Sequence, residues 1–98
     1  ADGIMIHSRK KEPDEIINFC KIYNNFENCP PLVVVPSSYN KIYERELKNI
    51  GANIVIYANH LLRASYPAMQ NVALEILKNK RSYEAEKKLL SIKKILKL

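Results

Sequence analysis

Polar side chains that could bind a small anion stand at the ends of short apolar runs in the sequence. His7 ends the run over residues 3–7 and is followed by Ser8, while Ser37 comes soon after a second run over residues 32–35. An imidazole N–H or a hydroxyl can donate a hydrogen bond to an anionic oxygen. If the two runs are neighbouring strands that end at the same edge of a sheet, these side chains could bind an anion there. The alternative is that His7 is a structural or loop residue and that each serine caps a helix or turn.

The sequence contains no motif for nucleophilic catalysis, for a phosphate-binding loop or for a metal site. No nucleophile and base stand at a recognisable spacing, and the only two glycines cannot form a phosphate-cradling loop. Cys20 and Cys29 belong to no Cys-x-x-Cys or Cys/His cluster, so we expect no metal site and two inert thiols, with Cys20 in the core. The adjacent carboxylates Asp14–Glu15 and the pair Glu44 and Glu46 are expected to be solvated on exposed helix faces.

Length and composition restrict the class of protein. Ninety-eight residues with 47% hydrophobic and 27% charged residues indicate one small globular domain. No apolar run approaches the roughly 18 to 20 residues that a bilayer span needs, and the first residues do not resemble a secretion signal. The free cysteines favour a reducing compartment, so we expect a cytoplasmic protein with no membrane partner.

The net positive charge comes from the end of the chain. The net charge is +6, and the segment 78–98 holds eight of the sixteen basic residues with only two acidic ones. A non-catalytic assembly or anion-binding module that uses this Lys-rich end is therefore one possible function. The lysines surround an aliphatic stripe and Tyr83 is the only aromatic residue among them, which is typical of a solvated amphipathic helix. No nucleic-acid partner is expected.

The elements that position the polar residues can be read from hydrophobic periodicity. Strands are predicted over residues 3–7, 32–35 and 53–57, the first of them buried on both faces. Helices are predicted over about 13–25, over 42–50 with Gly51 as a left-handed cap, and over 61–78 with a kink or fresh start near Pro67. A closing helix capped by Ser82 is expected to carry one apolar stripe, formed by Ala85, Leu89, Ile92 and Leu96.

The alternation of these elements predicts an α/β fold with parallel strands. Connections of this length between strands are typical of right-handed crossovers, so His7, Pro36 and Ala58 should lie at the same edge of the sheet. Three such strands need helices on both faces and leave both sheet edges unpaired. We therefore expect a piece of a larger α/β protein.

Three segments resemble one known family at the same spacing along the chain. They are Ala1–Lys10, Val34–Tyr39 and Val55–Ser65, the last of which contains Ala-Asn-His-Leu-Leu-Arg-Ala-Ser. In these segments the chain resembles the phosphoenolpyruvate mutase and isocitrate lyase superfamily. The resemblance implies the C-terminal part of a (β/α)8 TIM-type barrel: three parallel strands with crossover helices and terminal helices, residues 1–98 being a fragment of a single barrel domain.

The resemblance also implies an activity. The parent enzyme would interconvert phosphoenolpyruvate and phosphonopyruvate with Mg²⁺ as cofactor, the metal ligands and the mobile gating loop of the family lying outside this chain. Tyr57 stands where the family often has tryptophan and Ser38 where it often has lysine. These departures leave phosphonopyruvate hydrolysis, or another lyase reaction of the superfamily, open as an alternative.

Site residues follow from the same resemblance. His7, Ser8 and Ser37 are the expected substrate-binding residues, and no catalytic residue is expected within the chain. Asn59, His60 and Arg63 fit a structural role better than a phosphate site. The resemblance further implies a homo-oligomer, and we expect the isolated 98-residue chain to be inactive.

Overall fold

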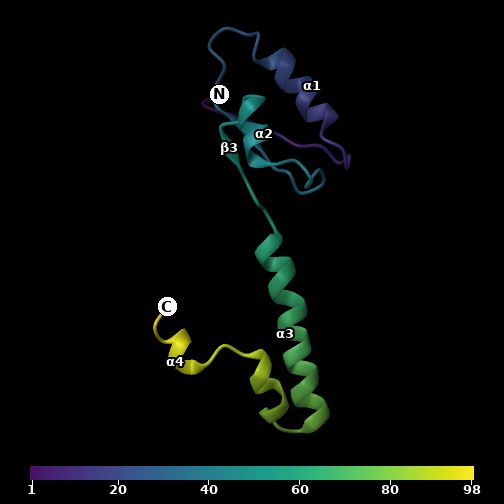
Figure 1. Ribbon diagram of the computed structural model, residues 1–98, viewed down its shortest axis with the longest axis vertical. Coiled ribbons are helices and arrows are strands. Elements are labelled where there is room, and N and C mark those ends of the chain that lie inside the picture. The colour runs from purple at the N-terminus through teal and green to yellow at the C-terminus, as the bar shows by residue number, and fades with distance from the viewer. The chain divides into compact units, whose positions relative to one another are not determined.

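The computed structural model describes residues 1–98 and divides them into two compact units, Ala1–Asn59 and His60–Leu98. Figure 1 shows the first unit in purple to teal and the second in green to yellow. The first contains β1 (Ile4–Ile6), α1 (Asp14–Tyr23), β2 (Leu32–Val34), α2 (Glu44–Asn49) and β3 (Ile54–Val55). The second contains α3 (His60–Asn79), the 3-10 helix η1 (Tyr83–Lys88) and α4 (Ile92–Ile95). None of the helices combines the length and the hydropathy that crossing a bilayer requires.

The three strands form one parallel sheet in the order β1-β2-β3. In the register of the sheet, Met5 pairs with Val33, and Val33 with Ile54. The parallel pairing predicted from the alternation of strands and helices is confirmed. Because the strands run in the same direction, the residues that follow them lie at one edge of the sheet, which we call the C-terminal edge.

Only one face of the sheet is covered within the first unit. Leu32 and Val34 are fully buried against a core that contains Cys20 of α1 and Leu47 of α2. On the opposite face, Met5 is 62% exposed. The expectation that the first strand is buried on both faces is therefore wrong for this chain, because both helices of the unit contribute to the same core.

The two helices of the first unit follow local rules. In α1 the buried residues Ile16, Cys20 and Tyr23 repeat at helical spacing, and the acidic residues of the first turn suit the positive end of the helix. The N-terminus of α2 is capped by the Glu46 carboxylate, which accepts a hydrogen bond of 2.8 Å from the Tyr43 N–H. After α2 the chain turns at Gly51, whose φ of 103° few other residues adopt, which confirms the predicted glycine cap.

Of the two alternatives expected near Pro67, a kink or a fresh start, the second unit excludes the fresh start. The helix α3 runs from His60 to Asn79 with Pro67 inside it, so the predicted fresh start does not occur. Proline removes one backbone N–H, which leaves the carbonyl four residues earlier without its helical donor. The remaining hydrogen bonds of a twenty-residue helix outweigh that loss.

The predicted closing helix is also wrong. In its place are the 3-10 helix η1 and the four-residue helix α4, separated at Leu89, whose ψ of 148° is extended. Ser91 caps α4 through its side chain, whereas Ser82 makes no capping hydrogen bond. Of the predicted apolar stripe only Ala85 is buried. Without a partner surface in this unit, the stripe gains little from a continuous helix.

Candidate functional site

The C-terminal edge of the sheet brings His7 and Ser37 to one backbone atom. The exposed His7 ring places Nδ1 3.1 Å from the carbonyl oxygen of Val35, the residue that follows β2. The backbone N–H of Ser37 donates to the same oxygen at 2.9 Å. The ends of β1 and β2 are thus joined by a three-residue arrangement of His7, Val35 and Ser37, which we call the edge cluster.

Ser8 is directed away from the edge cluster into the connection between β1 and α1. It is only 4% exposed, and its hydroxyl donates to Glu15 Oε2 at 2.6 Å. The Ser8 hydroxyl oxygen also accepts a hydrogen bond of 3.1 Å from the backbone N–H of Lys10. The Lys10 ammonium, 2.7 Å from the Glu15 carboxylate, and the Ser8 hydroxyl together lower the pKa of Glu15. The hydroxyl of Ser8 is engaged within the fold, so its role in substrate binding stays a prediction.

Replacement of each serine by alanine shows which of the two hydroxyls stabilises the fold. We expect Ser8→Ala to lower Tm by about 2 to 4 °C, because the connection after β1 loses two hydrogen bonds around a buried hydroxyl. Ser37→Ala is the matched control: its half-buried hydroxyl makes no hydrogen bond, so Tm should change by less than about 1 °C. Thermal unfolding of both variants checks the difference, and equal melting temperatures would contradict it.

A contact beside the third strand was not predicted from the sequence. The Tyr57 hydroxyl donates to Glu44 Oε1 at 2.7 Å, joining the segment after β3 to the first turn of α2. This hydrogen bond raises the pKa of Tyr57. Asp14, Glu15, Glu44 and Glu46 are exposed, as expected, and Glu15, Glu44 and Glu46 each also accept a hydrogen bond from the fold. The position of Tyr57 could have indicated this contact, because Tyr57 closely follows β3 as His7 follows β1.

The edge cluster offers hydrogen-bonding groups but no set of metal ligands. An imidazole at the edge of the sheet can donate to an anionic oxygen. No group of three His, Cys, Asp or Glu side chains in the chain could hold a metal ion. Both cysteines are free, and burial raises the pKa of Cys20, which makes it a poor nucleophile. The edge of the sheet therefore presents hydrogen-bonding side chains.

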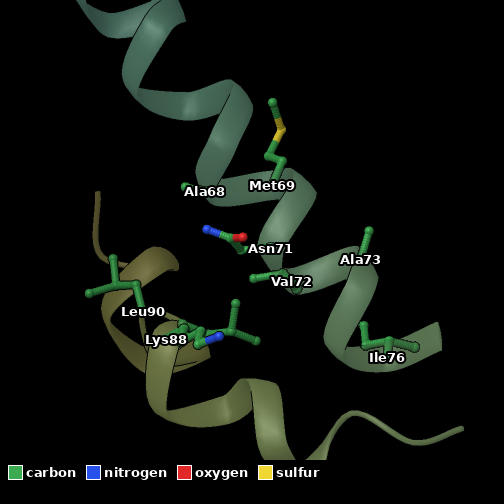
Figure 2. A pocket seen from close by; sticks show the side chains of 9 residues that line it. Ala68, Met69, Asn71, Val72, Ala73, Ile76, Lys88 and Leu90 are labelled. Atoms are coloured by element: carbon green, nitrogen blue, oxygen red, sulfur yellow. The ribbon is translucent and has the colours of Figure 1, made fainter. Parts of the chain in front are cut away.

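A hollow in the second unit has different chemistry. It has a volume of about 650 Å³ and lies between α3 and the segment around η1. Figure 2 shows Asn71 and Val72 on the side of α3 that faces Lys88 and Leu90. The one charged lining group is Lys88, whose Nζ is held 2.9 Å from Glu75 Oε1. An apolar hollow with its single cation already paired is poorly suited to a small dianion.

Comparison with known proteins identifies similar chains. Residues 1–77 match the family model described as phosphoenolpyruvate phosphomutase. Phosphoenolpyruvate phosphomutase of Tetrahymena pyriformis is 35% identical over 98 residues, which is 100% of this chain and 32% of the relative. This chain therefore spans about a third of the length of that relative.

Solved structures agree with the sequence match. Phosphoenolpyruvate phosphomutase from Streptomyces platensis subsp. rosaceus superposes with a TM-score of 0.86 at 32% identity, covering 99% of this chain and 33% of that structure. A phosphonopyruvate hydrolase in complex with oxalate and Mg²⁺ gives a TM-score of 0.82 at 38% identity. The match covers 99% of this chain and 34% of that structure. The parallel sheet with its helices is thus the fold of part of a TIM-type barrel, as the sequence resemblance implied.

Proposed function

The chain belongs to the phosphoenolpyruvate phosphomutase family, and on that basis we propose that it is part of an enzyme that interconverts phosphoenolpyruvate and phosphonopyruvate. The observation that carries the proposal is the place of His7 at the C-terminal edge of a parallel barrel sheet, joined to the end of β2 through Val35. In (β/α)8 barrels this edge is where active sites are built. His7, Ser8 and Ser37 are the proposed substrate-binding residues, and the Ser8 hydroxyl also supports the connection after β1.

The reaction is an internal transfer that needs no second substrate. The phosphorus–carbon bond of phosphonopyruvate breaks and a phosphorus–oxygen bond forms at the enol oxygen of the same molecule, which gives phosphoenolpyruvate. Both compounds carry a carboxylate and a phosphorus-centred anion. The part that this chain plays is therefore to bind and orient anionic oxygens, for which a hydrogen-bond donor at the sheet edge is suited.

A second candidate reaction is hydrolysis of phosphonopyruvate to pyruvate and phosphate. It is favoured by the 38% identity to a phosphonopyruvate hydrolase structure. The two reactions share the substrate and differ in whether water takes up the phosphorus group. Binding of the substrate anion by His7 serves either reaction, so the edge cluster does not discriminate between them.

Further properties belong to the proposal. We propose Mg²⁺ as the cofactor, as in the oxalate complex of the hydrolase, with ligands outside residues 1–98, because this chain forms no metal site. The isolated chain is then inactive. A homo-oligomer is supported by α3, a twenty-residue helix without a buried residue, and a cytoplasmic location by the two free cysteines.

The test is to identify the product formed from phosphonopyruvate. The full-length protein, meaning the longest polypeptide that its gene encodes, is incubated with phosphonopyruvate and Mg²⁺ and followed by phosphorus NMR. Phosphoenolpyruvate supports the mutase, and phosphate with pyruvate supports the hydrolase. The 98-residue chain alone is the control and should give neither product. Formation of neither product by the full-length protein would contradict both reactions.

A further inference from the structure

Asn53 fastens the start of β3 to the start of β2. Its side-chain Oδ1 accepts a hydrogen bond of 2.8 Å from the backbone N–H of Leu32, the first residue of β2. The backbone N–H of Asn53 donates to the carbonyl oxygen of Leu32, also at 2.8 Å. Both backbone groups of Leu32 therefore have a partner on the next strand. We call this contact, from an aspartate or asparagine to the first residue of the strand before it, the Asx clamp.

The backbone of β3 places Asn53 for this contact. The N–H of Ile56 donates to the carbonyl oxygen of Val34 at 2.9 Å, so the backbone groups of Ile56 face β2. Backbone groups of successive strand residues point to alternate sides, and those of Ile54, two residues earlier, also face β2. Asn53 thus directly precedes a residue whose backbone faces the strand before its own.

Asp2 occupies the same place relative to β1. Ala1-Asp2 stands before the first apolar run of the sequence as Ala52-Asn53 stands before the third. The N–H of Ile4 donates to the carbonyl oxygen of Pro31 at 2.9 Å, so the backbone groups of Ile4 face β2. By the same alternation those of Gly3 face the opposite side, which is the open edge of β1. Asp2 therefore directly precedes a residue whose backbone faces this edge.

The side chain of Asp2 is suited to a clamp at the open edge. Like Asn53 it is exposed, and it takes part in none of the ion pairs of the chain. An ionised carboxylate is an acceptor and can take the place of the asparagine oxygen opposite a backbone N–H. A parallel strand added at this edge would present the N–H of its first residue to Asp2, as β2 presents that of Leu32 to Asn53.

The occupant of the edge follows from the barrel. This chain spans 32% of the phosphoenolpyruvate phosphomutase of Tetrahymena pyriformis, and closure of a barrel leaves no strand edge unpaired. We propose, on the basis of the proposed function, that the strand before β1 in the full-length protein lies on the open edge of β1 and that Asp2 clamps it. The Asp2 carboxylate accepts a hydrogen bond from the backbone N–H of the first residue of that strand.

The position of the clamp determines what it contributes. Asp2 precedes β1, whereas His7 follows it, so the two residues lie at opposite edges of the sheet. In (β/α)8 barrels residues at the N-terminal face of the strands serve stability, and active sites lie at the other face. Loss of the clamp should therefore weaken the fold of the full-length protein and leave turnover unchanged.

The experiment compares melting temperatures of variants of the full-length protein. Asp2→Ala should lower Tm by about 3 to 6 °C, because a backbone N–H loses a charged acceptor. Asp2→Asn is the matched variant: its amide oxygen still accepts, as that of Asn53 does, and Tm should stay within about 2 °C of the wild type. Asn53→Ala is the reference for loss of a clamp and should lower Tm by about 2 to 4 °C. In all three variants kcat/KM for phosphonopyruvate should stay within about threefold of the wild type.

The outcomes separate this inference from the function it rests on. If Asp2→Ala leaves Tm unchanged while Asn53→Ala lowers it, Asp2 forms no clamp. If Asp2→Asn lowers Tm as much as Asp2→Ala, the acceptor alone is insufficient, which contradicts the clamp as well. If Asp2→Ala also changes the molar mass measured by light scattering, the open edge pairs with a second copy and the inference is wrong. The proposed function fails by a different result, a wild type that forms neither product, and the melting temperatures do not depend on that result.

Discussion

Replacement of His7 by alanine is expected to lower kcat/KM for phosphonopyruvate by about tenfold to a hundredfold in the full-length protein. The reason is the loss of a charge-assisted hydrogen bond to an anionic oxygen of the substrate. Thermal stability should change little, since the ring is exposed and its one hydrogen bond, to Val35, lies at the surface. Steady-state kinetics and a thermal melt on the same purified variant give both quantities.

A structural role for His7 would produce the opposite pattern. If the ring only ties β1 to the end of β2, His7→Ala should lower Tm by several degrees while kcat/KM stays within about threefold of the wild type. His7→Asn distinguishes the two roles further, because it can keep the bond to Val35. A structural role predicts that asparagine restores Tm, and a binding role predicts that kcat/KM stays low in this variant.

Replacement of Gly51 by alanine is expected to destabilise the fold by about 1 to 3 kcal/mol from backbone strain alone. The φ of Gly51 is 103°, and a Cβ there would lie 2.6 Å from Asn24 Oδ1. Relief of that clash requires Asn24 to move, which breaks its hydrogen bond of 2.9 Å to the carbonyl of Ile50. The free energy of unfolding from urea titrations of the full-length protein measures the loss.

The other glycine provides the matched control. A Cβ at Gly3 would meet only the carbonyl oxygen of Pro31 at 3.5 Å, an ordinary contact, and Gly3 has no positive φ. Gly3→Ala should therefore change stability by less than about 1 kcal/mol. In the double variant Gly51→Ala with Asn24→Ala, the clash is absent but the strain remains. Equal stabilities of the two single variants would show that the turn at Gly51 is not strained.

The sheet could be predicted because its sequence is locally unambiguous. The run Leu32 to Val35 is aliphatic and bounded by prolines, and the segments between the strands are long enough for helical crossovers. Parallel pairing then follows from the direction of the chain. Burial of the strands was harder to predict from the sequence, because it depends on which surfaces lie against the sheet and not on the strand residues. Met5 has the same apolar character as Ile4, yet it is more exposed.

The segment after α3 shows where periodicity is insufficient. The spacing of Ala85, Leu89, Ile92 and Leu96 fits one helix, but a helical stripe forms a helix only when a surface binds it. In the second unit the ion pair of Lys88 with Glu75 holds η1 beside α3, and Leu89 is extended. A contact between side chains thirteen positions apart leaves no periodic signal in the sequence.

The candidate site was predictable as a set of side chains and not as a set of contacts. His7 could be placed at the end of its strand because strands of an α/β fold end at a common edge. Its acceptor could not be foreseen, since every residue has a carbonyl and only the register of β1 against β2 selects that of Val35. Similarly, the bond of Ser8 to Glu15 depends on the path of the connection, which no residue type specifies.

The partner of His7 is a main-chain atom, and this affects how the site tolerates mutation. A substitution at position 35 changes the side chain but cannot remove the carbonyl oxygen, so the contact is protected from most single-base changes in that codon. The contact is instead sensitive to substitution at position 36, because loss of the proline allows Val35 to leave its extended conformation. A screen of all substitutions at both positions would therefore show a permissive codon next to a restrictive one. The genetic constraint on this site would thus lie on a residue whose side chain has no part in the chemistry.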